Sequence, residues 1–232
     1  MTAQSRGVLA SLPTAGSIRG MSHVAGFSGG VAVVCLRPEA LPYAADVFAA
    51  GVRAALEQDV PQTQVIVVDG RGAAATADFV PPGVDAGRIE HVCGTFATRA
   101  AMCRAGIAAC STDYVLLVAC DRVPVLLRRS AAQTLMMAAT RGTPQDLVYA
   151  DYARRGADGR VVDVHLLDWH PGRLRDTFDI GLAVLYRTAA LRESGAFGTD
   201  YTAAEWYDAR LRVSERGRVA HVANRYAGAL YT

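Results

Sequence analysis

The hexapeptide VIVVDG, Val65 to Gly70, decides the fold of this chain. A run of valine and isoleucine followed by a carboxylate and a glycine is typical of a buried strand that ends in a turn. A similar strand, VAVVCL, is predicted at residues 31–36, and the apolar spacing of residues 41–58 predicts a helix between the two. Together they form a βαβ unit. Asp69 then lies at the carboxyl end of a parallel strand, where open α/β sheets bind their ligands.

The rest of the chain continues this alternation up to residue 151 and then changes. Beyond a Gly-, Ala- and Pro-rich connection, strands are predicted at 88–92, 114–120 and 146–151, with helices at 96–107 and 126–140. This order predicts a parallel α/β sheet. Asp158-Gly159 then signals a hairpin turn, with flanking strands at 151–152 and 161–166. The last elements are an apolar segment at 180–186, helices at 188–194 and 203–216, and a strand at 219–222.

The composition bounds the class of protein. A hydrophobic fraction of 51% with 20% charged residues over 232 residues indicates one large globular domain. The longest apolar run, residues 114–120, is too short to cross a bilayer, so no membrane span is expected. All 24 basic residues are arginine and the net charge is only +2. Lysine chemistry is thereby excluded, and a nucleic-acid partner is not expected.

Two further features bear on the domain limits and the location. Residues 1–30 are rich in Gly, Ser and Ala without periodicity, and we expect a flexible leader before a domain at 31–232. The five cysteines include no CxxC pair, which argues against a zinc site. They fall mostly in apolar strands or helix faces, so we expect buried free thiols in a cytoplasmic protein.

Five segments, taken in order, resemble the family 2 glycosyltransferases, which are inverting enzymes with a GT-A fold. The resemblance runs from Val31 to Tyr231. It implies a single α/β domain of GT-A type, with a mainly parallel sheet, helices on both faces and a short antiparallel element in the C-terminal third. The segments are VAVVCLRPE (31–39), ALEQDVPQTQVIVVDGRG (55–72), FATRAAMCRAGIAACSTDYVLLVACDRV (96–123), DLVYADYARRGADGRVVDVHLLDWHP (146–171) and GAFGTDYTAAEWYDARLRVSERGRVAHV (195–222).

The resemblance implies transfer of a sugar, with inversion, from a nucleotide diphosphate sugar to the hydroxyl of a glycan, a lipid-linked glycan or a natural product. Lipid-linked acceptors would bring peripheral membrane contact. The motifs depart from the family pattern: Gly70 replaces the second Asp of VVDDGS, Ala119 the first Asp of DxD, and Trp206 the Asp of the ED pair. An alternative hypothesis is therefore a catalytically inactive GT-A-like protein that binds a nucleotide, a glycan or a protein partner.

The donor-site residues that the resemblance implies are Leu36, Asp69, Asp121 and Arg122. Leu36 stands where the family has a Pro after its first strand. The Asp69 carboxylate can accept a hydrogen bond from the N–H of uracil or guanine, whereas the structural alternative is an Asp that caps the following turn. Arg122 can neutralise the charge of the leaving diphosphate. We expect Asp69 and Asp121 to line one pocket, at the ends of neighbouring strands.

The resemblance also implies a Mn²⁺ or Mg²⁺ ion on the donor diphosphate, which hard oxygen ligands would hold. Asp121 is the remaining carboxylate of the DxD motif. His221 is the first candidate for a further ligand, although a lone histidine in a strand is more often structural. Because Ala119 replaces a carboxylate, we expect only weak metal dependence.

Glu205 and Asp208 are the candidate catalytic residues, three apart on one predicted helix and therefore on one face. Glu205 is the candidate general base, which takes the proton of the acceptor hydroxyl. We expect its carboxylate to face the cleft that contains Asp121. For Asp208 the alternative is an ion pair with Arg212. Since sugars stack on aromatic faces, the candidate acceptor-binding residues are Trp169, His170 and Trp206.

Overall fold

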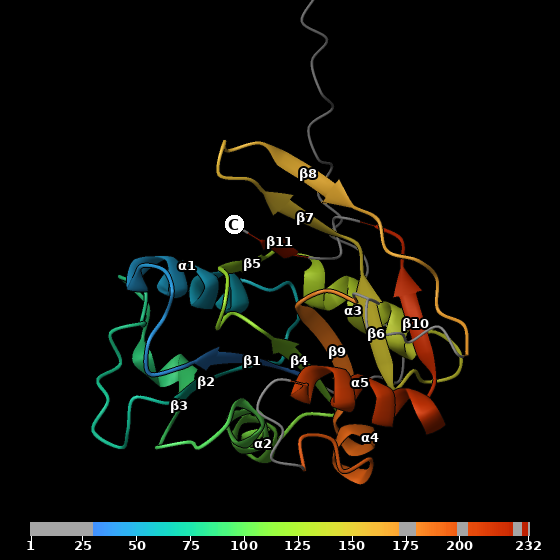
Figure 1. The fold of residues 1–232 in the computed structure, drawn as a ribbon, viewed down its shortest axis with the longest axis horizontal. Helices are drawn as coiled ribbons and strands as arrows, with labels where there is room; N and C mark the ends of the chain where they lie inside the picture. The colour runs from blue at the N-terminus through green and yellow to red at the C-terminus, as the bar shows by residue number, and fades with distance from the viewer. Residues whose placement is uncertain (1–29, 172–179, 199–203, 225–228, 232) are drawn as a thin grey trace, which may run out of the picture.

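A seven-stranded sheet forms the centre of the protein in the computed structural model, which describes residues 30–171, 180–198, 204–224 and 229–231 (Figure 1). Its order is β10-β6-β9-β4-β1-β2-β3. Strand β9 runs antiparallel to both neighbours, and the other pairs are parallel. The strands are β1 (Val31–Arg37), β2 (Thr63–Asp69), β3 (Ile89–Cys93), β4 (Tyr114–Val118), β6 (Leu147–Ala150), β9 (Ala183–Arg187) and β10 (Val219–Val222).

Helices cover both faces of this sheet (Figure 1). One face packs against α1 (Ala45–Leu56) and α3 (Ala131–Thr140). The other packs against α2 (Arg99–Ala109), α4 (Thr188–Glu193) and α5 (Glu205–Arg216). A short 3-10 helix, η1 (Ala86–Arg88), precedes β3. The mainly parallel sheet with helices on both faces, as predicted from the sequence, is confirmed.

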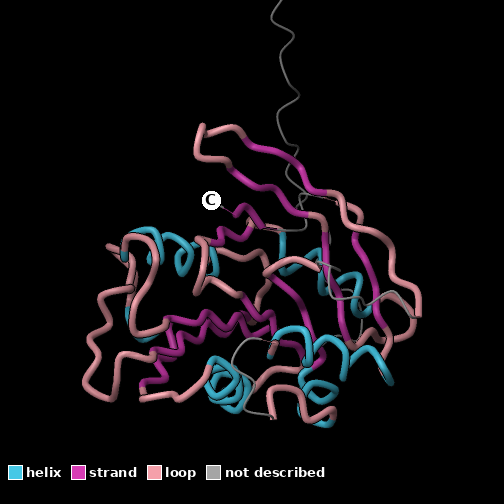
Figure 2. Tube along the Cα trace, viewed as in Figure 1, coloured by secondary structure: helices cyan, strands magenta, loops and turns pink. Residues whose placement is uncertain are grey.

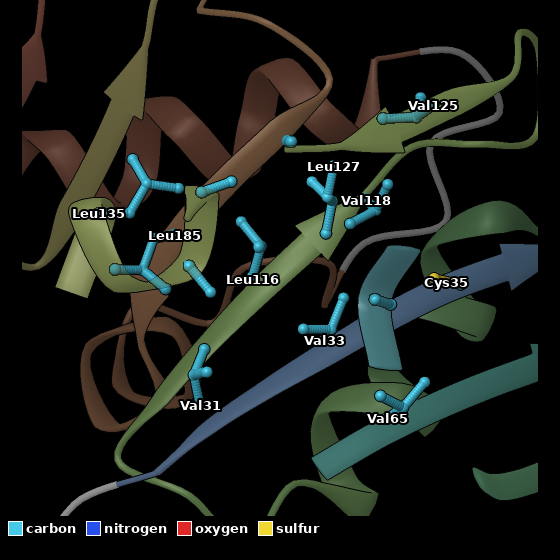
Figure 3. Close-up of a cluster of buried hydrophobic side chains, with 14 of the residues drawn as sticks. Val31, Val33, Cys35, Val65, Leu116, Val118, Val125, Leu127, Leu135 and Leu185 are labelled. Atoms are coloured by element: carbon cyan, nitrogen blue, oxygen red, sulfur yellow. The ribbon is translucent and has the colours of Figure 1, made fainter. Parts of the chain in front are cut away.

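Side-chain alternation along the strands builds two cores. In β1, Val31, Val33 and Cys35 belong to the core under α1 and α3, whereas Ala32, Val34 and Leu36 belong to the core under α2. Figure 3 shows the first of these cores, where side chains of adjacent strands meet. Each fully buried aliphatic side chain contributes roughly 1.5–3 kcal/mol, so the VIVVDG strand and its neighbours stabilise the sheet by burial on both faces.

Gly106 sets how closely α2 approaches the sheet. A Cβ atom at this position would lie 2.6 Å from a methyl group of Val34 and 2.9 Å from one of Val68. Only glycine permits this contact without a shift of the helix. Because α2 follows the carboxyl end of β3, its first residue, Arg99, is held near that edge of the sheet.

A second sheet, β5-β11-β7-β8, contains the short antiparallel element expected in the C-terminal third. Strands β7 and β8 form a hairpin, with Tyr152 opposite Val164 and Gly159 at a φ of +77°. Figure 2 shows this hairpin extending away from the main sheet. The turn signal in the sequence is therefore confirmed. The strands are β5 (Val125–Leu127), β7 (Tyr152–Arg155), β8 (Val161–Val164) and β11 (Ala229–Tyr231).

One predicted helix starts too early. The sequence predicts a helix over 126–140, but α3 begins at Ala131, and Val125–Leu127 is strand β5. The backbone of β5 pairs with β11 near the end of the chain. A long-range contact, which no local pattern reports, therefore decides its conformation.

Two further findings concern membrane-spanning helices and the cysteines. No helix there is long and apolar enough to cross a membrane. The five cysteines are free thiols; Cys93 is partly buried and the others are buried. The flexible leader predicted at residues 1–30 falls, apart from Gly30, outside the described residues.

Candidate functional site

Two predicted donor residues follow strands at the carboxyl edge of the main sheet. Strand β1 lies between β2 and β4, with Arg37 opposite Asp69 and Cys35 opposite Val118. Asp69 ends β2, and Asp121 follows shortly after β4. The two aspartates thus lie on either side of β1 rather than on adjacent strands. This is the edge at which open parallel sheets bind ligands.

An ion-pair network closes the end of β2, and we call it the Asp69 network: Asp69, Arg71, Asp78, His91 and Arg37. Arg71 donates to both Asp69 oxygens, from Nε to Oδ1 at 3.0 Å and from Nη2 to Oδ2 at 2.8 Å. His91 Nε2 lies 3.2 Å from Oδ2. Arg71 also donates to Asp78, at 2.9 and 3.0 Å, and Arg37 donates to it at 3.3 Å. Each carboxylate in the network is therefore bound by arginine.

Asp69 is not available to a ligand in this arrangement. Its side chain is 0% exposed, and Oδ1 also accepts from the Arg71 backbone N–H at 3.1 Å. Burial alone raises the pKa of this carboxyl, but hydrogen bonds from Arg71 and His91 outweigh that effect and hold the pKa below its ordinary value. The structural alternative for Asp69 is thus observed, since its carboxylate closes the turn that follows β2; its role in donor binding stays a prediction.

A second set of charges, which we call the Arg99 bridge, joins Asp121, Arg99 and Glu205. Arg99 is the first residue of α2 and follows the helix cap Thr98, whose Oγ1 accepts from a backbone N–H at 3.2 Å. Arg99 Nη1 donates to Asp121 Oδ2 at 2.7 Å, and Arg99 Nε lies 2.8 Å from Glu205 Oε1. The DxD-position aspartate and the candidate base, distant in sequence, therefore share one guanidinium.

Glu205 begins α5 and is buried within the bridge. Its side chain is 1% exposed. Neither carboxylate oxygen has an aligned hydrogen-bond donor among the residues that the structure describes. The contact with Arg99 is thus a close ion pair without hydrogen-bond geometry. As expected, Glu205 lies toward Asp121 and away from bulk solvent.

Arg99 is not predicted from the sequence. One arginine among 24 carries no signal of its own. Its position directly after Thr98, at the start of a helix that follows a strand, is the feature that could have found it, because such helix starts lie at the ligand-binding edge. Arg71 and His91 were missed for the same reason: their roles come from contacts with Asp69.

The other predicted donor residues lie apart from this contact. The Leu36 side chain is 1% exposed and packs in the core under α2. Strand alternation turns this side chain into the core, and the role of Leu36 in donor binding stays a prediction. Arg122 is exposed beside Asp121 and stays available to a ligand.

The residues around Asp121 do not fit a divalent cation. Mn²⁺ and Mg²⁺ need several oxygen ligands around one point. Ala119 offers only a methyl group, and Asp121 Oδ2 is already bound to Arg99. In the described ranges, no group of three or more His, Cys, Asp or Glu side chains could hold a metal ion.

His221 does not share this site. It lies on β10, three strands from β4, which corresponds to about 14 Å at the usual strand spacing. Its ring nitrogens lie 2.9 Å from Asp151 and 2.8 Å from Asp168, and its ring stacks on Tyr149 with centroids 4.7 Å apart. Two strands, β6 and β9, separate β10 from β4, and His221 pairs with Asp151 and Asp168 instead; its role as a metal ligand stays a prediction.

The remaining predictions concern α5 and the segment before residue 172. Asp208 Oδ2 accepts from Arg212 Nε at 2.7 Å, so the structural alternative for Asp208 is observed. Trp169 and Trp206 are partly buried against the core under α2. The rings of Trp206 and Phe197 pack edge to face, with their centroids 5.5 Å apart. His170 is exposed and its Nδ1 donates to the neighbouring carbonyl at 3.0 Å.

Comparison with known proteins bears on the fold. No family model and no curated protein matches the sequence. S. aureus TarS 1–349 matches with a TM-score of 0.63 and 15% identity, over 88% of this chain and 60% of that one. Its complex with UDP matches with a TM-score of 0.60 and 14% identity, over 87% of this chain and 60% of that one. Its complex with UDP-GlcNAc matches with a TM-score of 0.57 and 13% identity, over 87% of this chain and 58% of that one.

The chain has a GT-A fold. TarS is a family 2 glycosyltransferase with that fold, so the fold implied by the sequence resemblance is confirmed. This chain spans 60% of the TarS 1–349 segment and 36% of a longer TarS structure. At such low identity the likeness establishes the fold, and the activity depends on the site itself.

Proposed function

We propose that the protein is an inverting glycosyltransferase that moves a sugar from a nucleotide diphosphate sugar to an acceptor hydroxyl of a glycan, a lipid-linked glycan or a natural product. The observation that carries this proposal is the Arg99 bridge. It places Asp121 and Glu205 on one guanidinium at the ligand-binding edge. The fold shared with TarS, whose structures include complexes with UDP and UDP-GlcNAc, supports a nucleotide-sugar donor.

The proposed chemistry is a single displacement. The acceptor oxygen attacks the anomeric carbon, Glu205 takes the proton of that hydroxyl, and the bond from the anomeric carbon to the diphosphate breaks. Arg99 and Arg122 supply positive charge for the leaving diphosphate. Asp121 holds the Arg99 guanidinium in position. We keep Trp169, His170 and Trp206 as the proposed acceptor-binding residues.

A second candidate function is a catalytically inactive GT-A-like protein that binds a nucleotide, a glycan or a protein partner. The observation in its favour is the burial of Glu205, whose side chain is 1% exposed and paired with Arg99. The replacement of motif carboxylates by Ala119 and Trp206 points the same way. Under this hypothesis the bridge serves only to hold α2, α5 and the end of β4 together.

A thermal-shift screen followed by a transfer assay distinguishes the active glycosyltransferase from the inactive binding protein. UDP, GDP and their sugar conjugates are tested with and without EDTA, since a ligand at a hundred times its Kd adds about 2.7 kcal/mol of stability. Transfer is then measured with the donor that binds. Binding with turnover supports the transferase, and binding without turnover on any acceptor class supports the inactive protein. No stabilisation by any nucleotide contradicts the proposed donor class.

A further inference from the structure

Arg99 occupies the position that a cation bound to Asp121 would need. Its Nη1 lies 2.7 Å from Asp121 Oδ2 and its Nε lies 2.8 Å from Glu205 Oε1. A divalent ion on Asp121 would therefore meet the positive charge of Arg99 at short range and in a partly buried setting, where repulsion between like charges is strong. The side chains present fit a guanidinium and do not fit a metal ion.

Charged side chains of both signs lie around the bridge. Asp121 and Glu205 pair with Arg99, and Arg104, a second arginine of α2, donates to the carbonyl of Phe197. All four act on the buried thiol of Cys103: burial raises its pKa, Glu205 and Asp121 raise it further, and Arg99 and Arg104 lower it.

Arg99 keeps one edge for a ligand. Its side chain is 18% exposed, against 8% for Asp121 and 1% for Glu205. Nε and Nη1 are engaged in the bridge, whereas Nη2 donates no hydrogen bond within the described part of the chain. Because two carboxylates hold the guanidinium in one orientation, it loses less side-chain entropy on binding a phosphate than a mobile surface arginine would.

We propose that Arg99 is the resident cation of the donor site and binds the diphosphate of the nucleotide sugar directly, in place of the Mn²⁺ or Mg²⁺ ion that the family resemblance implies. The inference rests on the proposed function, which supplies the diphosphate ligand. The sequence predicts weak metal dependence, and under this inference donor binding does not depend on a metal ion at all.

The test compares the wild type with Arg99→Ala, Arg99→Lys and the control Arg129→Ala. Arg129 forms an ion pair with Asp59 on the surface and is 79% exposed. Calorimetric titrations use Mn²⁺ alone, and UDP and GDP in EDTA. The wild type binds a nucleotide equally well with and without metal. Arg99→Ala loses about tenfold or more in that affinity. Arg99→Lys falls in between, because lysine keeps the charge but not the planar fork.

Saturable Mn²⁺ binding by the wild type overturns the inference, as does wild-type nucleotide affinity in folded Arg99→Ala. Circular dichroism checks that each variant is folded. If Arg99→Ala does not fold, the nucleotide affinity of Arg99→Lys is compared with that of the wild type instead. If the wild type binds neither UDP nor GDP, the proposed donor class fails and the inference falls with it, because no diphosphate ligand remains. If a nucleotide binds the wild type and folded Arg99→Ala equally well, the inference falls alone and the donor class stands.

Discussion

The Asp69 network and the Arg99 bridge lie at the same edge of one sheet, and their buried carboxylates, Asp69 and Glu205, differ in how far they are hydrogen-bonded. Both oxygens of Asp69 accept several hydrogen bonds, and its side chain is 0% exposed. Both oxygens of Glu205 lack an aligned donor among the described residues, although its side chain is equally deep. An unsatisfied buried polar group costs about 1–3 kcal/mol. Such a cost at the Glu205 carboxylate points to a ligand site, whereas the fully hydrogen-bonded carboxylate of Asp69 points to a structural role.

The largest expected effect comes from Glu205→Gln. Glutamine keeps the size of the side chain but cannot take the acceptor proton, so turnover falls by about 10²–10⁴-fold while donor affinity stays nearly constant. The measurement is kcat with saturating donor, next to the donor Kd by calorimetry. Asp208→Asn makes the same chemical change three residues further along α5 and serves as the control. A Glu205→Gln variant with wild-type kcat would remove Glu205 as the base.

Asp69→Ala tests the other side of the comparison. Removing one partner of a buried ion pair leaves the others unpaired and costs about 3–5 kcal/mol; we expect the lower end, because Arg71 is 21% exposed. Urea unfolding at neutral pH measures the change. At a temperature where the variant is folded, its donor affinity matches the wild type. A loss of donor affinity without a loss of stability would show that Asp69 belongs to the donor site.

The pH dependence of stability extends this test. The pKa values of Asp69 and Asp151 are lowered in the folded protein, from an ordinary value of 3.8. For both, burial acts in the opposite direction and is outweighed by hydrogen bonds to the carboxylate. Each group therefore stabilises the fold above pH 3.8, and this contribution is lost as the pH falls through the folded value. In urea unfolding, the free energy of unfolding falls less between pH 7 and pH 3 for Asp69→Asn than for the wild type. Equal slopes would show that Asp69 does not contribute.

The smallest effect is expected at Asp208. Its ion pair with Arg212 is an i,i+4 pair on one helix, with Arg212 36% exposed, and such pairs contribute about 0.3–0.5 kcal/mol. Asp208→Asn therefore lowers the unfolding free energy by no more than that and leaves kcat near the wild-type value. A double-mutant cycle with Arg212→Gln isolates the pair. A fall in kcat of tenfold or more would place Asp208 in the catalytic site instead.

The strands, most of the helices and the hairpin could be predicted from the sequence because their signals are local. The apolar runs of β1, β2 and β4, the spacing in α2 and the Asp158-Gly159 turn each lie within a few residues of one another. The exceptions are β5 and β11, which pair with each other, and β9, whose antiparallel insertion between β4 and β6 has no sequence signature. In each case a partner far along the chain decides the conformation.

The candidate site divides in the same way. The sequence by itself determined that carboxylates end β2, follow β4 and begin α5, since strand ends and helix starts are local features. Which of these carboxylates is free for chemistry was decided only by the tertiary structure. Arg71 and His91 close Asp69, Leu36 turns into the core, and His221 lies across the sheet from Asp121. Arg99 meets Asp121 and Glu205 only because sheet order and the close packing of Gly106 bring α2 to the ends of β4 and α5. Charge pairing between elements depends on distance in space, and the spacing of residues along the chain does not encode that distance.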